Sequence, residues 1–256
     1  MKKQILMIAF TGISLSSLFL TSCKKETIQK TVVSGSDDLT TALAQFRSLS
    51  GDSLNTTPTS PKADGRREIN WDAVPAASSN TNTFPGDFFN STDVAAPNGR
   101  KRGAVFSTSG GFRVDTSAFA DLEATNASQF SAFSPKRTFS PVGSNTFDIT
   151  FKLPGQSTPA SVNGFGAIFS DVDIAGSTTM EFFENYTSLG KFEVPVRSGS
   201  TSFSFLGVHF PENKVTKVKI TCGNGSIGVG VKDISSGGTN DLVILDDFIY
   251  GEPGIY

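Results

Sequence analysis

Short runs in which apolar and polar side chains alternate fill most of the chain after residue 65, and they constrain the fold more than any other feature of the sequence. In residues 147–153, Phe, Ile, Phe and Leu alternate with Asp, Thr and Lys, and Pro154 follows directly. A period of two residues is typical of a β-strand with one buried face. The same pattern recurs in residues 179–182, 192–196, 206–210, 217–222, 227–231 and 242–250, with weaker examples in 104–114 and 118–124. Many short strands separated by turns favour an antiparallel sandwich or barrel.

A helical pattern precedes the strands. Ser36 is placed to cap a helix, and Asp37 and Asp38 would fall in its first turn, where the helix dipole favours acids. Gly51 follows the expected end. The apolar residues between them recur at a period of 3.6, and they are Leu39, Ala42, Leu43, Phe46 and Leu49. The sequence therefore predicts one short amphipathic helix over residues 36–50, whose apolar face docks on the following domain.

The N-terminus has the features of an export signal. Lysines at positions 2 and 3 precede a mostly apolar segment, residues 5–20, which ends in Leu20-Thr21-Ser22-Cys23. These features resemble a bacterial lipoprotein signal peptide. The resemblance implies cleavage before Cys23 and a lipid thioether on Cys23, so that a membrane is the expected partner. An ordinary secretory signal and an anchoring helix are the alternatives.

The same resemblance gives a location and a layout for the chain. Lys24, rather than an Asp, follows the cysteine, which favours a lipid anchor in the outer membrane of a Gram-negative bacterium, on either its periplasmic or its external face. The expected segments are a signal peptide (1–22), a tether (23–35), the helix (36–50), a linker (51–65) and a β-sandwich domain (66–256). Lipidation would leave Cys222 without a disulfide partner, and its register with Val218 and Ile220 predicts a buried free thiol.

Composition and motifs exclude several classes of protein. A net charge of -2 without a basic block predicts no positively charged surface for nucleic acid. One His and two Cys cannot form the usual zinc site of three or four ligands. Residues 223–228 match the GxGxxG pattern of nucleotide sites, but strand alternation follows them instead of a helix, and Asn224-Gly225 favours a hairpin turn. We therefore expect no nucleotide. No Ser stands in a GxSxG context, and His209 alternates within a strand pattern, so we assign no catalytic residue.

Two aromatic residues, Trp71 and Tyr186, are the candidates for contact with a sugar ring. A flat aromatic face packs well against the CH groups of a sugar. For Trp71 a place in the core is the favoured alternative, because 23 Phe against three Tyr and one Trp describe an apolar core rather than an aromatic cleft.

Four acidic residues are candidate ligands of a calcium ion: Asp171, Asp173, Asp246 and Asp247. Consecutive residues of a strand point to opposite faces, so either Asp246 or Asp247 should face inward and needs a partner. We favour a salt bridge to Arg66 or Arg67, which would close the sandwich. The alternative is Ca²⁺, bound by the inward carboxylate together with one of the first two acids.

Four sequence blocks carry a resemblance: GRREINWD (65–72), GFGAIFSDVD (164–173), Phe205-Leu206-Gly207-Val208 and ILDDFIYGEP (244–253). In this order they resemble a family of uncharacterised secreted bacterial proteins, over roughly residues 36–253. Members of that family look like single jelly-roll domains behind a short amphipathic helix. The resemblance thus implies an all-β, antiparallel β-sandwich of jelly-roll type preceded by one helix, and it implies no activity, cofactor or catalytic residue.

These observations lead to two hypotheses about function. The first is a non-catalytic binding or surface-structural module, with an extracellular glycan as the favoured ligand. The alternative is a glycan-acting hydrolase that uses a pair of carboxylates about 5 Å or 6.5–9.5 Å apart, since the sequence is rich in acids and does not reveal their separation. A groove lined by Trp or Tyr without paired acids would favour binding, and two facing carboxylates would favour hydrolysis.

Overall fold

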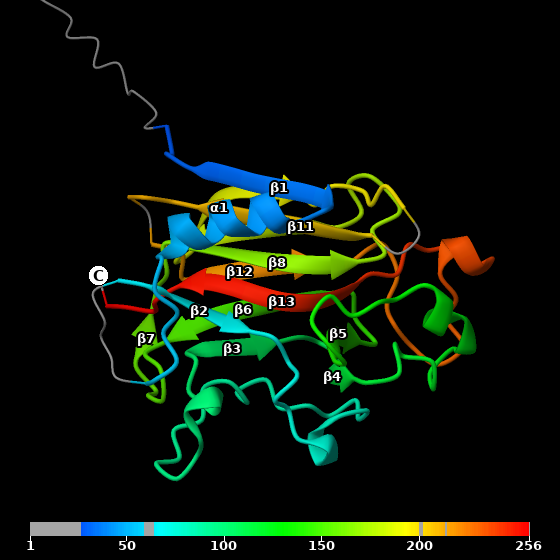
Figure 1. Ribbon diagram of the computed structural model, residues 1–256, viewed down its shortest axis with the longest axis horizontal. Coiled ribbons are helices and arrows are strands. Elements are labelled where there is room, and N and C mark those ends of the chain that lie inside the picture. Colours follow the sequence, from blue (N-terminus) through cyan, green and yellow to red (C-terminus); the bar gives the residue numbers. More distant parts are fainter. Residues whose placement is uncertain (1–26, 59–63, 200–201, 213, 256) are drawn as a thin grey trace, which may run out of the picture.

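The computed structural model describes residues 27–58, 64–199, 202–212 and 214–255. Cys23, the expected signal peptide and the first part of the expected tether lie outside the described residues. Within them, two antiparallel sheets and one α-helix form an all-β sandwich (Figure 1), which confirms the predicted fold class. In the same residues no helix is both long and apolar enough to cross a membrane.

The two sheets contain seven and six strands. The seven-stranded sheet consists, in spatial order, of β1 (Thr31–Asp37), β11 (Phe203–His209), β8 (Gly164–Ser170), β13 (Ile244–Gly251), β5 (Thr138–Val142) and β4 (Gly111–Asp115), with β2 (Arg66–Ile69) also paired to β13. The six-stranded sheet consists of β10 (Thr187–Glu193), β9 (Thr179–Glu184), β12 (Lys217–Thr221), β6 (Thr146–Lys152) and β3 (Ala104–Ser107), with β7 (Pro159–Ala160) also paired to β6. Four short 3₁₀ turns lie in the loops, at Ala76–Ser78, Asn98–Arg100, Ala124–Ser128 and Ile234–Ser236.

The chain passes repeatedly between the sheets. The strands from β5 to β13, apart from β7, lie in the spatial order β5-β13-β8-β11 in one sheet and β6-β12-β9-β10 in the other. Eight antiparallel strands interleaved in this way are the connectivity of a jelly roll. The remaining strands extend the edges of this framework.

The alternating pattern correctly located β6, β9 and β12 of the six-stranded sheet, whereas the strand predicted over 192–196 overlaps β10 only in residues 192–193, and β7 was not predicted. In β6, for example, every second side chain is buried, and in β12 the second and fourth of the five residues are buried. By contrast, all residues of β8 and all residues of β13 are buried, because the seven-stranded sheet is covered on both faces. The second sheet covers its inner face, and the helix α1 (Thr40–Ser50) lies across its outer face (Figure 1).

Helix α1 docks on the sheet as predicted. Ala42, Leu43 and Phe46 are buried, and they belong to a small core with side chains of the sheet, namely Val33, Ile168, Phe205 and Ile249. Phe46 lies directly over Gly166 and Gly207, which are paired in β8 and β11. A Cβ atom on Gly207 would lie 2.5 Å from the Phe46 ring, so glycine is required for this close approach.

The segments around the helix differ from the prediction. The helix begins at Thr40 rather than at Ser36, its N-cap is Leu39, and no acid lies in its first turn. The reason is that the end of the expected tether forms β1, which pairs with β11 over its whole length. Asp38 still stabilises the start of the helix, because its Oδ1 accepts a hydrogen bond from Thr40 N at 2.9 Å. The expected linker also contacts the domain, since the buried Asn55 donates to Glu252 at 2.8 Å.

Two predicted strands are absent from the described residues. Residues 118–124 form turns, since Asp115 Oδ1 accepts hydrogen bonds from Ser117 N and Phe119 N and bends the chain there. Residues 227–231 form no strand either, and Val229 is exposed. The hairpin expected at Asn224-Gly225 does not close, because both backbone N–H groups donate instead to the carbonyl oxygen of Asp241.

Trp71 lies in the main core and is 1% exposed, which confirms the core position that the composition favoured and excludes Trp71 from the candidates for contact with a sugar. Its indole ring stacks on Phe139 with 4.1 Å between the ring centroids, and its edge meets Phe89 and Phe248. The indole N–H donates to the carbonyl oxygen of Asp246 at 2.8 Å. Such a site satisfies the polar edge of the ring and leaves no face for a ligand.

Candidate functional site

Helix α1 packs on the seven-stranded sheet. In the described residues, therefore, no α-helix covers the outer face of the six-stranded sheet. The strand alternation places polar side chains there, among them Asp148, Thr150 and Lys152 of β6 and Lys217 and Lys219 of β12. The Lys217 Nζ atom lies 3.7 Å from Asp148 Oδ2, so charges of both signs are mixed on this face. A polar sheet face without a covering helix is a candidate binding surface.

A groove opens at one end of this face. Its volume is about 380 Å³, and it is lined by Thr150, Phe151, Lys152, Pro159, Ala160, Asn185, Tyr186 and Thr216. We call it the Tyr186 groove. It combines hydroxyl, amide and ammonium groups with the apolar surfaces of a proline, an alanine and two aromatic rings.

The turn between β9 and β10 places Tyr186 at the edge of this groove. Asn185 and Tyr186 form a two-residue connection, because Glu184 pairs directly with Thr187. Asn185 has a φ of 55°, and its N–H donates to Thr216 Oγ1 at 2.7 Å, which fixes the turn against the segment before β12. The Tyr186 side chain is fully exposed as a result. The strand after this turn begins at Thr187, earlier than the pattern in residues 192–196 predicted.

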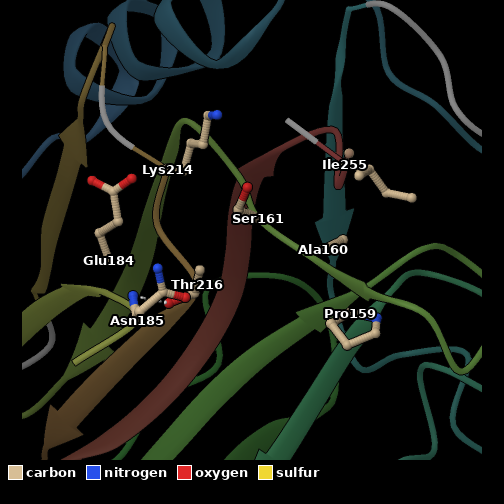
Figure 2. A pocket seen from close by; sticks show the side chains of 9 residues that line it. Pro159, Ala160, Ser161, Glu184, Asn185, Lys214, Thr216 and Ile255 are labelled. Atoms are coloured by element: carbon tan, nitrogen blue, oxygen red, sulfur yellow. Dashed lines mark hydrogen bonds between the residues drawn. The ribbon is translucent and has the colours of Figure 1, made fainter. Parts of the chain in front are cut away.

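A second cavity of about 190 Å³ shares Pro159, Ala160, Asn185 and Thr216 with the Tyr186 groove. It is bounded by Glu184, Lys214 and Ile255 in addition. Figure 2 shows Glu184, Asn185 and Thr216 on the left of this cavity and Pro159, Ala160 and Ile255 on the right. The shared residues make the two cavities adjacent parts of one depression, in which Glu184 is the one acidic residue among the described lining residues.

Asp246 and Asp247 do not point to opposite faces as predicted. The pairing of β13 with β8 shifts register between Leu245 and Phe248, so the two acids sit in a β-bulge. Both are buried, and Ser134 Oγ lies 2.9 Å from one oxygen of each carboxylate. Asp246 also accepts from Phe133 N at 2.7 Å. Carboxyl groups this close together and this deeply buried leave no room for a sugar ring between them.

The buried acids of the bulge have raised pKa values. Burial raises the pKa of Asp246 to about 9, and the neighbouring charge of Asp247 adds to the effect. Burial also raises the pKa of Asp247, while its hydrogen bonds to Asp246 and Ser134 act in the opposite direction. The pair therefore holds a proton near neutral pH.

The salt bridge predicted between these acids and Arg66 or Arg67 is not present. Arg67 is fully buried and pairs with Glu252, with its Nη2 atom 2.7 Å from Oε1. Arg66 pairs with Glu68, with 2.7 Å between Nε and Oε1. An ion pair thus joins β2 to the residue that follows β13, but it uses a different acid from the one that we predicted.

Asp171 and Asp173 lie in another part of the molecule, just after β8. They form a group with Asp233, since one oxygen atom from each residue lies within 4.8 Å of the others. Arg197 contacts Asp171 through Nη1, and its Nε lies 2.5 Å from Asp173 Oδ1. The structure therefore divides the four predicted calcium ligands into two separate pairs, and it adds Asp233 to the first pair. We call Asp171, Asp173 and Asp233 the acidic triad.

Asp171 has a raised pKa. Burial raises this pKa to about 8, although the charge of Arg197 opposes the shift, and the charges of Asp233, Asp173 and Asp241 add to it. Asp241 is itself buried next to the triad, and its oxygens accept hydrogen bonds from the backbone N–H groups of Asp173 and Ile174.

Sequence reasoning missed Asp233, Asp241 and Arg197 as members of this cluster. Each lies in a loop far along the chain from Asp171, and their proximity depends on the order of strands in the sheets. Asp233 carries a local signal, because it caps the 3₁₀ turn at Ile234–Ser236 through Ser235 N. That signal indicates a turn and gives no information on a ligand.

The remaining candidates have structural positions. Cys222 is a buried free thiol, as predicted, and burial raises its pKa. His209 is half-buried in β11, and burial lowers its pKa. Comparison of the chain with models of known protein families and with curated proteins finds no match.

Proposed function

We propose that this protein is a lipid-anchored, extracytoplasmic binding module without catalytic activity, and that its Tyr186 groove binds an extracellular glycan. The observation that carries the proposal is the fully exposed Tyr186 ring at the edge of a groove lined by hydroxyl and amide groups. An exposed aromatic ring on a rigid two-residue turn offers an apolar face, and covering that face with a ligand is favourable. The CH face of a sugar ring fits that role, and its hydroxyls fit the polar lining.

The carboxylates of the described residues support binding rather than hydrolysis. A glycosidase needs two carboxylates that face one another across the sugar. In the described residues that line the depression, Glu184 has no acidic counterpart. The neighbouring acids Asp246 and Asp247 are buried in the bulge of β13.

The experiment is a glycan array probed with residues 24–256, followed by titration of the best ligand into variants. Tyr186→Ala should weaken binding at least about tenfold, which corresponds to about 1.4 kcal/mol, and Tyr186→Phe should bind like the unchanged protein. Val94→Ala is the matched control, because Val94 is almost equally exposed and lies outside the groove. Full binding by Tyr186→Ala would contradict the proposal, and release of shorter sugars from the ligand would favour the hydrolase instead.

The lipid anchor is tested separately. Metabolic labelling with an acyl-chain probe should mark the unchanged protein in the outer-membrane fraction and should not mark Cys23→Ala. Cys222→Ala is the control, since Cys222 is buried in the domain. Labelling that persists in Cys23→Ala would contradict the anchor and leave the glycan proposal standing.

A further inference from the structure

We propose that the acidic triad of Asp171, Asp173 and Asp233 binds one divalent cation of the calcium class. The three carboxylates come from two loops distant in sequence, and one oxygen of each lies within 4.8 Å of the others. Carboxylate oxygens are the preferred ligands of such hard cations. None of the three residues lines the Tyr186 groove, so this site is independent of the proposed glycan binding.

The burial of Asp171 is the observation that points to a ligand. Its side chain is 1% exposed, so water does not reach its carboxylate oxygens. The guanidinium of Arg197 contacts Oδ1, whereas Oδ2 has no polar donor in the described residues. A buried carboxylate oxygen without a donor is strongly unfavourable. A cation bound among the triad would supply the missing partner.

The charges of the cluster match a divalent ion. One guanidinium, that of Arg197, faces three carboxylates. The triad and Arg197 together therefore carry an excess of two negative charges when all are ionised. Asp241, buried beside them, adds a third. A single divalent cation neutralises the excess of the triad, which a monovalent ion would not do.

The surrounding hydrogen bonds hold the ligands in place. Asp233 is fully buried, and its carboxylate is fixed by Ser235 N at one oxygen and by Leu242 N at the other, each at 2.8 Å. Asp241 holds the loop of Asp173 through backbone N–H groups at 3.2 Å. Oδ1 of Asp233 also accepts from Ser235 Oγ, whereas Oδ2 accepts from Leu242 N and keeps a second lone pair for a metal. Water from the side of the half-buried Asp173 would complete the six to eight oxygen ligands that calcium needs, about half of which the protein supplies.

The test uses the purified full chain, treated with EDTA and dialysed, and CaCl₂ alone as the probe. Isothermal titration should show one binding site per chain. At a hundredfold excess over the dissociation constant, Ca²⁺ should raise the melting temperature by about 5–10 °C. Asp171→Asn and Asp173→Asn should each weaken binding at least about tenfold. Asp87→Asn is the matched control, since Asp87 is exposed and lies outside the triad, and it should bind Ca²⁺ like the unchanged chain.

Two results would overturn the proposal. The first is the absence of both heat and a change in melting temperature at millimolar Ca²⁺. The second is undiminished Ca²⁺ binding by Asp173→Asn, which decides the matter even if Asp171→Asn fails to fold, because Asp173 is only half-buried. Neither result depends on glycan binding, so this proposal and the proposed function can fail separately.

Discussion

Replacing Asp246 by Asn should make the stability of this protein less dependent on pH. Ser134 Oγ lies 2.9 Å from one oxygen of Asp246 and 2.9 Å from one oxygen of Asp247. A hydroxyl has a single proton and cannot donate to both carboxylates at once. One of the two acids must therefore carry a proton of its own, which agrees with a pKa of about 9 for Asp246, caused first by burial and then by the charge of Asp247.

The magnitude follows from proton linkage. The pKa of Asp246 rises from 3.8 to about 9 on folding, so between these values the folded chain binds one proton more than the unfolded chain. The resulting stability is fully present below the unfolded pKa and is lost as pH rises toward the folded pKa, at about 1.4 kcal/mol per pH unit. In the Asp246→Asn variant, the new amide would donate like the protonated acid at every pH. Relative to the unchanged protein, the variant should gain stability as the pH rises from about 5 to about 8, by at most about 1.4 kcal/mol per pH unit.

The assay is urea unfolding across this pH range, followed by fluorescence. Trp71 is the one Trp of the chain, and its indole N–H contacts the Asp246 carbonyl, so its emission reports on the site. Asp171, whose pKa is also raised, loses its proton in both proteins, and its effect cancels in the comparison. Asp87 is exposed, so the free energy of unfolding of Asp87→Asn should depend on pH in the same way as that of the unchanged protein. Parallel profiles for Asp246→Asn and the unchanged protein would refute the shared proton.

Three further substitutions or modifications test the packing. Cys222 should resist a polar maleimide in the native protein and react on unfolding, because it is buried and its pKa is raised; rapid native labelling would contradict this. Arg67→Ala should lower the free energy of unfolding in urea by about 3–5 kcal/mol, because it removes the guanidinium that faces the buried Glu252; a loss below about 1 kcal/mol would contradict the importance of this ion pair. Gly207→Ala should cost about 1–3 kcal/mol and speed hydrogen exchange in α1, because the new Cβ displaces Phe46; unchanged exchange in α1 would show that the helix adapts without shifting.

The sequence was sufficient to locate strands that have one buried face and one exposed face. Residues 147–153 and 217–222 were expected to be strands, and they correspond closely to β6 and β12. Their outer face meets water, so selection for burial acts on every second residue and leaves a period of two. The docking of α1 was predictable for the same reason, because its apolar stripe needs a partner surface.

Segments whose structure depends on tertiary contacts were not predictable. Residues 31–37 are mostly polar, yet they form β1 because β11 offers an unpaired edge. Asp246 and Asp247 occupy a bulge, which breaks the alternation on which the prediction of opposite faces depended. Residues 227–231 show the strand pattern, but no hairpin forms before them, because the N–H groups of Asn224 and Gly225 donate to the carbonyl oxygen of Asp241. In each case a partner distant in sequence decides the local structure.

The residues of the candidate sites also differ in whether the local sequence identifies them or only the fold brings them together. Tyr186 lies in a turn that the local sequence signals, and that turn places it at the surface. Composition alone favoured a core position for Trp71, and its contacts with five aromatic rings place it in the core. Asp171 and Asp173 were recognisable as acids after a buried strand, but Asp233 and Arg197 join them through the fold, which no local pattern reveals.

The position of β1 bears on where the proposed binding site would operate. Since pairing with β11 begins at Thr31, at most residues 24–30 can act as a tether between a lipid on Cys23 and the domain. A tether of this length spans at most about 25 Å when fully extended. A lipidated chain would therefore hold the sandwich close to the membrane surface, where the groove would meet only ligands that lie near that surface. A short tether thus favours a glycan attached to the same membrane or packed against it over one that lies far out in solution.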